Sequence, residues 1–130
     1  PELLKIHENL AEQHLNRLNK HELIYKIEKL LGSGLLESNE FSLDHIAEHL
    51  GKNPRTLRAD LLQIQSSFEK ILSQYREKLA RQLLAHTTES IDQIIYLTGF
   101  SEPSAFSRAF KRWTGETPTA YRQRKNEKFN

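Results

Sequence analysis

The residues best suited to chemistry lie between positions 104 and 112, where short hydroxyl and basic side chains recur at helical spacing. Serine allows close approach to a partner, and an arginine guanidinium can donate two hydrogen bonds to O6 and N7 of guanine. Later basic groups on the same face suit phosphate. The residues are Ser104, Ser107, Arg108, Lys111 and Arg112. They predict a surface that reads nucleic acid, with Arg108 as the main base contact; the alternative is an ordinary solvated helix face.

Weaker candidates of the same type occur elsewhere in the sequence. The segment 54–64 offers Arg55, Thr56 and Arg58. Arg76 and Arg122 suit either phosphate or a structural role. Glu102 and Pro103 stand at the start of the 102–113 helix and are expected near base edges.

Every segment that must position these residues has the apolar spacing of a helix. The pattern, with its caps, prolines and glycines, predicts helices over 2–19, 20–31, 43–50, 54–64, 67–86, 91–98, 102–113 and 118–126. The expected start signals of five of these helices are Ser42, Asn53 with Pro54, Ser90, Ser101 with Pro103, and Thr117 with Pro118. No stretch alternates apolar and polar residues as a strand does. The sequence therefore predicts an all-α fold.

Two parts of the sequence repeat one pattern: a short apolar helix, a glycine and a second helix. Gly51 and Gly99 end the two short helices, and each is expected to need a positive φ. The second helices have apolar anchors on one face and leave the other face free, which is typical of a helix-turn-helix. The anchors are Leu57 and Leu61 in the first unit, and Phe106 and Phe110 in the second.

The helix over 67–86 lies between the two units. Its apolar stripe predicts that it packs against both, and about 20 residues at 1.5 Å each span roughly 30 Å. One turn of DNA is about 34 Å. A rod of this length can hold two second helices in successive major grooves.

Composition and charge narrow the classes of protein. Of 130 residues, 37% are hydrophobic and 28% are charged, which is typical of a globular domain. The absence of cysteine excludes disulfides, thiolate metal sites and a cysteine nucleophile. Residues 1–50 carry net charge −4 and residues 100–130 carry +4. This asymmetry favours a polyanionic partner at one end, with a solvated charged surface as the alternative.

The N-terminus has neither a signal peptide nor an apolar run of the roughly 20 residues that a membrane span needs. These features predict a cytoplasmic location. Methionine is absent altogether, so we interpret the sequence as a piece of a longer protein.

Two other functions fit some of the residue patterns. His45, Glu48 and His49 have the residue types and spacing of an inverted zinc-hydrolase motif. However, the hydrophobic core needs Ile46 and Leu50 of the same helix, and no further acidic metal ligand has a recognisable context. The sequence thus predicts neither an enzyme nor a metal or cofactor. The second alternative is a helical protein-interaction module with an incidental basic surface, whose candidate docking residues are Leu3, Leu10, Leu35 and Leu36.

Several motifs resemble one known family in both order and spacing. The second unit closely resembles the C-terminal signature of AraC/XylS-type transcription regulators, and residues 46–57 and 75–84 resemble its first helix-turn-helix and linking helix. The C-terminal motifs are Gly99-Phe100, Ser104-x-Phe106-Ser107-Arg108-x-Phe110-Lys111 and Gly115-x-x-Pro118-x-x-Tyr121-Arg122.

The resemblance implies a sequence-specific, double-stranded DNA-binding domain. It would have two helix-turn-helix units joined by a long central helix, about seven helices plus an N-terminal linker helix. Residues 20–130 would form this domain. Residues 1–19 would be a linker or the tail of a missing N-terminal effector or dimerisation domain. RNA polymerase is a further implied partner.

The sequence departs from the family pattern at four positions. An arginine usual in the first recognition helix is replaced by Ala59, and acidic Asp60 follows it, so we expect the first unit to discriminate sequences less than the second. Asp60 could instead pair with Arg55 or Arg58. Ile95 and Thr98 also differ from the family and suggest local repacking.

Overall fold

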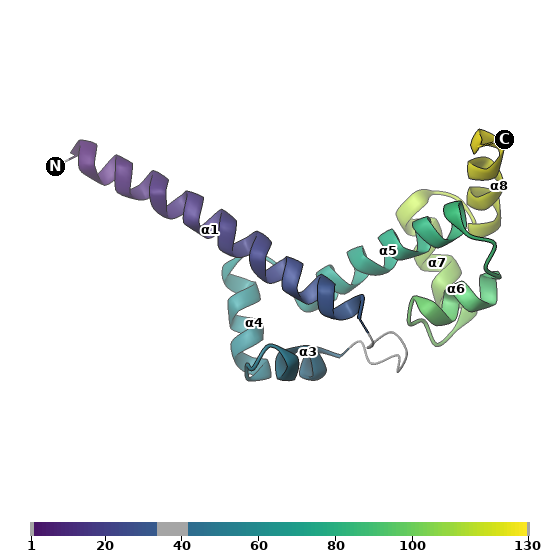
Figure 1. The fold of residues 1–130 in the computed structure, drawn as a ribbon, viewed down its shortest axis with the longest axis horizontal. Coiled ribbons are helices and arrows are strands. Elements are labelled where there is room, and N and C mark those ends of the chain that lie inside the picture. The colour runs from purple at the N-terminus through teal and green to yellow at the C-terminus, as the bar shows by residue number, and fades with distance from the viewer. Residues whose placement is uncertain (1, 34–41, 130) are drawn as a thin grey trace.

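The structure is a computed structural model that describes residues 2–33 and 42–129 of the protein. Figure 1 shows a long helix that projects from two helical units joined by a central rod. The helices are α1 (Glu2–Leu31), α3 (Leu43–His49), α4 (Pro54–Gln63), α5 (Phe68–His86), α6 (Ile91–Leu97), α7 (Pro103–Thr114) and α8 (Pro118–Phe129). The described residues include no strand, and the predicted all-α fold is confirmed.

The first two predicted helices are one. The helices expected over 2–19 and 20–31 form a continuous α1 of 30 residues. No glycine or proline lies between residues 2 and 31, so nothing interrupts the backbone hydrogen bonds. Among the described side chains of α1, those of its last turns pack on the body, where Ile27 and Leu31 are fully buried.

The described residues form two hydrophobic cores, one in each helix-turn-helix unit. The first gathers residues of α1, α3 and α4, and the second gathers residues of α6, α7 and α8. The central helix α5 contributes to both, through Phe68 and Ile71 near its start and through Ala80 and Leu84 near its end. Its 19 residues span about 28 Å. The prediction of a shared central helix is confirmed.

Local signals place most helix ends as predicted. Hydroxyl or amide oxygens of Ser42, Asn53 and Ser90 accept a hydrogen bond from the first turn of α3, α4 and α6. Gly51 and Gly99 have φ of 67° and 81°, in the left-handed region that glycine adopts most easily. These two turns let each second helix cross the first.

The start of α7 differs from the expectation. The sequence predicts that Ser101 opens this helix, but the N-cap residue is Glu102, whose side chain makes no capping hydrogen bond. Pro103 occupies the first turn, where its missing N–H costs nothing, so the helix begins there without a hydroxyl cap.

Candidate nucleic-acid interface

The helix α7 has two sharply different faces. Phe106, Ala109 and Phe110 are buried on one side. All seven predicted candidates on and just before α7 are exposed: Glu102, Pro103, Ser104, Ser107, Arg108, Lys111 and Arg112. Among the residues whose side chains are described, no salt bridge engages Arg108, Lys111 or Arg112. The structure therefore brings this predicted group together on the exposed, positively charged side of α7, with Arg112 at the edge that faces α5.

An aromatic cluster holds α7 in place. The Phe106 ring lies 5.5 Å from Phe100 and 5.9 Å from Phe110, and Phe110 meets Tyr121 of α8 edge-on at 5.2 Å. Such pairs add stability beyond the area that they bury. The exposed face is thus carried by a helix whose rotation is set by rigid side chains.

The first unit presents a smaller candidate surface. Arg55, Thr56 and Arg58 are exposed on α4, as is Ala59, opposite the buried Leu57 and Leu61.

Asp60 does not pair with an arginine of its own helix, the alternative that the sequence left open. Its Oδ2 atom instead accepts a hydrogen bond of 2.6 Å from Nζ of Lys52, in the turn before α4. Asp60 lies on the flank of the helix that faces this turn, whereas the two arginines lie on the open face.

The other two predicted arginines make internal contacts. The Arg76 guanidinium donates to the carbonyl of Gly99 over 3.3 Å and lies 4.8 Å above the Phe100 ring. Burial lowers the pKa of Arg76 below its ordinary value. These contacts fasten the turn of the second unit to α5, which favours the structural role for Arg76.

Arg122 closes the C-terminal end of the central helix. From α8 it donates to the carbonyls of Leu83, Leu84 and Thr87 over 3.1 to 3.3 Å. The last carbonyls of a helix run out of backbone donors within it, so the guanidinium helps to cap the end of α5, where Thr87 also donates to the Leu83 carbonyl. The structural role is favoured here too.

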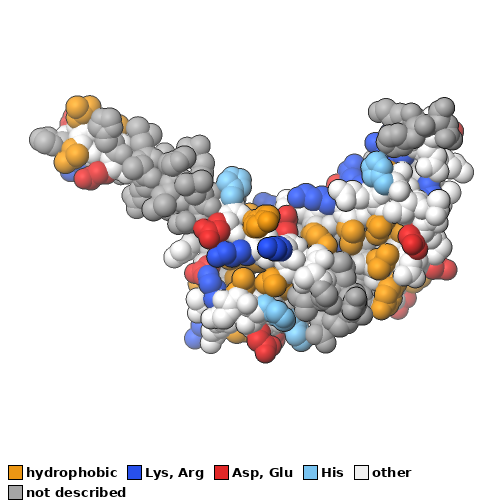
Figure 2. All heavy atoms as spheres, viewed as in Figure 1, with side chains coloured by type: hydrophobic (Ala, Val, Ile, Leu, Met, Phe, Trp, Pro, Cys, Tyr) orange, Lys and Arg blue, Asp and Glu red, His pale blue; other side chains and the backbone are white. Residues whose placement is uncertain are grey.

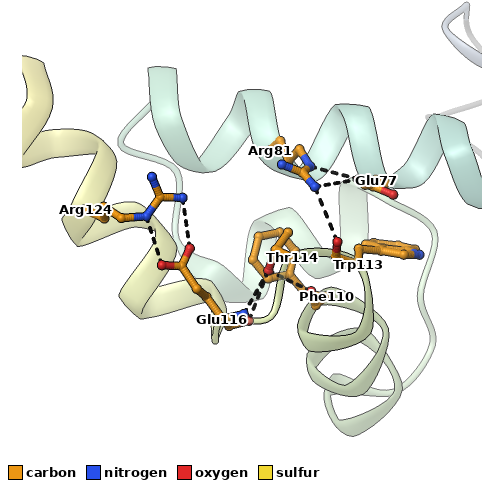
Figure 3. A network of polar contacts seen from close by, with 7 residues as sticks. All are labelled: Glu77, Arg81, Phe110, Trp113, Thr114, Glu116 and Arg124. Carbon is orange, nitrogen blue, oxygen red and sulfur yellow. Dashed lines mark hydrogen bonds and ion pairs between the residues drawn. The ribbon is translucent and has the colours of Figure 1, made fainter.

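A polar network that the sequence analysis did not single out joins α5, α7 and α8 (Figure 3). Arg81 is bound by Glu77 at 2.7 Å and donates to the carbonyl of Trp113 over 3.5 Å. Burial lowers the pKa of Arg81, but its hydrogen bonds to Glu77 and Tyr121 outweigh burial and raise the pKa above its ordinary value. The four-residue spacing of Glu77 and Arg81 is a signal that could have found the pair.

The end of α7 is held by the same network. The Thr114 hydroxyl donates to the Phe110 carbonyl, and the Glu116 carboxylate takes two hydrogen bonds, of 2.9 and 3.0 Å, from Arg124. The network therefore fixes where α7 ends and α8 begins.

The histidines of α3 serve the helix itself. The ring of His45 contacts the capping Ser42 hydroxyl, and Nδ1 of His49 donates to the His45 carbonyl over 2.8 Å. Among the residues whose side chains the structure describes, no three histidine or acidic side chains gather as metal ligands.

Both departures in α6 are explained by packing. Ile95 is buried in the second core. Thr98 is also buried, and its hydroxyl donates to the Ile94 carbonyl over 2.8 Å, so the polar group has a partner. Local repacking relative to the family stays a prediction.

The apolar docking candidates lie on both described and undescribed parts of the protein. Leu3 is 72% exposed at the free end of α1, and Leu4 and Ile6 are exposed beside it. Figure 2 shows these apolar side chains at the tip of the projecting helix. The side chains of Leu10, Leu35 and Leu36 lie outside the described residues. No described helix has the length and apolar character that crossing a membrane requires.

Comparison with known proteins connects this architecture to one family. Residues 46–124 match a family described as a helix-turn-helix domain. The ornithine utilization regulator of Pseudomonas aeruginosa is 32% identical over 95% of this protein, and the regulator GlxA of Rhizobium meliloti is 42% identical over 61%. The protein spans 36% and 25% of the length of these two relatives.

Solved structures agree with the sequence matches. A DNA-binding transcriptional dual regulator from Escherichia coli K-12 superposes with a TM-score of 0.73 at 25% identity, covering 81% of this protein and 93% of that one. An AraC-type regulator from Chromobacterium violaceum gives 0.64 at 28% identity, covering 83% and 96%. The protein belongs to the AraC/XylS family of transcription regulators and contains the tandem helix-turn-helix domain of that family.

Proposed function

We propose that this domain binds a specific sequence of double-stranded DNA, with α7 in one major groove and α4 in the next. The observation that carries the proposal is the exposed face of α7, where serines and basic groups stand over a buried aromatic cluster. Arg108 is central on this face and suits a guanine, while Lys111 and Arg112 suit phosphates beyond it.

The central helix supports two simultaneous contacts. Its span of about 28 Å is close to the roughly 34 Å that separates successive major grooves on one side of DNA. The first unit contributes fewer groups, since Ala59 has only a methyl group and Asp60 is occupied by Lys52. We therefore assign most of the sequence discrimination to the second unit.

The wider assignment follows from the family. We propose that residues 1–19 are a linker or the tail of a preceding effector or dimerisation domain, that residues 20–130 form the DNA-binding domain, and that RNA polymerase is a partner. The exposed Leu3, Leu4 and Ile6 support a covering partner for α1. The proposed activity is binding, without catalysis or a cofactor, and its proposed location is the cytoplasm, where DNA is accessible.

Selection of bound duplexes from a random pool tests this function. We expect a recovered site with two conserved segments about one helical turn apart, the stronger one protected by the second unit. Affinity should fall steeply as salt rises, because bound phosphates release counterions. Recovery of no shared sequence, together with salt-insensitive binding to a protein partner, would instead favour a helical protein-interaction module.

A further inference from the structure

A pocket lies between the two units, on the side of α7 that faces the first half of α5. Its volume is about 210 Å³. One stripe of α5 lines it, and the C-terminal half of α7 forms the facing wall. Its polar and aromatic lining includes Glu69, Ser73, Arg76, Arg112 and Trp113. We call this pocket the saddle.

The saddle collects hydrogen-bond donors. The Ser73 hydroxyl and the Trp113 indole N–H make no hydrogen bond to any described residue, and the Arg112 guanidinium makes no salt bridge to one. Figure 3 shows Trp113 beneath α5, with its ring nitrogen at the end remote from Arg81. Hydroxyl, indole and guanidinium groups together form a donor set that suits an anion.

The base of the saddle is also positively charged. Arg76 lies there, held by Gly99 and stacked on Phe100, with its charge partly removed from water. An anion in the saddle would offset the unfavourable burial that lowers the pKa of Arg76. One carboxylate opposes this field, since the exposed Glu69 also lines the saddle.

The position of the saddle identifies the anion. Arg112 follows Arg108 by four residues, so the two guanidiniums are neighbours along α7, one on its open face and one toward the saddle. When α4 and α7 occupy successive major grooves on one side of DNA, the intervening minor groove faces α5, which joins them. The phosphates that border this minor groove then lie close to the saddle.

We propose that the saddle seats a backbone phosphate of the bound DNA, with Ser73, Arg112 and Trp113 donating to its oxygens. This inference rests on the proposed function and extends it, because it makes the central helix part of the DNA-binding surface. A phosphate contact located between the two recognition helices also fixes how these helices align with the base pairs, since it holds the DNA against α5.

Neutral phosphate analogues test whether the saddle binds a backbone phosphate. A methylphosphonate replaces a charged phosphate oxygen with a methyl group. It is placed at each phosphate in turn in a duplex selected for binding by the wild-type protein. We expect one or two positions bordering the central minor groove to weaken wild-type binding about tenfold, as for loss of a charge-assisted hydrogen bond.

Variants show whether these positions belong to the saddle. Ser73→Ala combined with Arg112→Gln should bind the unmodified duplex about tenfold more weakly and lose most of its sensitivity at the same positions. Matched controls are Gln74→Ala and Lys70→Gln, which change exposed residues of α5 outside the saddle lining and should keep the wild-type sensitivity. Glu69→Gln should tighten binding about threefold, since it removes the opposing charge.

The outcomes separate the two proposals. If the wild-type protein selects no sequence, both the proposed function and the phosphate seat fail. If it selects a site but the double variant keeps full sensitivity to methylphosphonate at every position, only the proposed phosphate site in the saddle is wrong. If Arg112→Gln fails to fold, Ser73→Ala is tested alone, provided that its melting temperature is unchanged. Reduced sensitivity at the same phosphate positions supports the phosphate site, and full wild-type sensitivity overturns it.

Discussion

Nζ of Lys52 lies 2.6 Å from Oδ2 of Asp60, so the turn between α3 and α4 is tied to the middle of the first candidate recognition helix. Both side chains are about one-third exposed, at 36% and 34%. A pair this accessible contributes at most about 1 kcal/mol to folding. Its larger effect is electrostatic, because each partner cancels the other's charge close to the proposed DNA.

Asp60→Ala should therefore tighten binding to a random duplex, by about threefold at low salt and less at high salt. The substitution removes a negative charge and releases the Lys52 ammonium for phosphate. Asp92→Ala, an exposed acid in the supporting helix α6, is the control for the change in net charge. Titration at two salt concentrations measures both. A loss confined to the selected duplex would mean that Asp60 takes part in recognition.

Arg108→Ala should cost about 1–3 kcal/mol of binding to the selected duplex and relax the preference at one base pair. The side chain is central on the exposed face of α7, where a guanidinium can reach a base edge. Fluorescence titration against the selected duplex and its single-base variants measures the loss. Equal losses on selected and random duplexes would rule out a base contact.

Lys111→Ala should act differently, although Lys111 is exposed on the same helix. A phosphate contact carries no sequence information, so binding to all duplexes should weaken alike. The slope of log affinity against log salt concentration should decrease in magnitude by about one, because one fewer counterion is released. Titrations over a series of salt concentrations measure this slope. A slope identical to that of the wild-type protein would place Lys111 away from the backbone.

Phe106→Ala should destabilise the fold by about 3–5 kcal/mol, since it removes a fully buried ring and leaves a cavity beside Phe100 and Phe110. Leu62→Ala is the control, because Leu62 is 75% exposed and should change stability by less than about 0.5 kcal/mol. Chemical denaturation measures both. An unchanged midpoint for Phe106→Ala would contradict the packing of the second core.

The Glu116–Arg124 pair predicts an acid-sensitive contribution to stability. The hydrogen bond from Arg124 lowers the pKa of Glu116 below its ordinary value of 4.5. Because the folded pKa is depressed, the contribution is present above about pH 4.5 and is lost as pH falls through the lower folded value. The stability difference between wild type and Glu116→Gln should shrink across this acidic range. A difference that does not change with pH would exclude a titrating pair.

The local features of this protein were determined by its sequence. The caps at Ser42, Asn53 and Ser90 and the positive φ at Gly51 and Gly99 depend on a few neighbouring residues, and all were predicted. The open face of α7 was predicted for the same reason, since helical periodicity alone separates its apolar anchors from its serines and basic groups.

Contacts between distant residues were decided only by the tertiary structure. Asp60 had arginine neighbours on its own helix but pairs with Lys52, because the turn brings that ammonium to its flank. Arg76 and Arg122 looked equally suited to phosphate, yet their guanidiniums meet backbone carbonyls 23 and up to 39 residues away. The saddle likewise joins residues of α5 and α7. Sequence spacing specifies which side chains share a helix face, whereas the packing of helices on the central rod decides what each face meets.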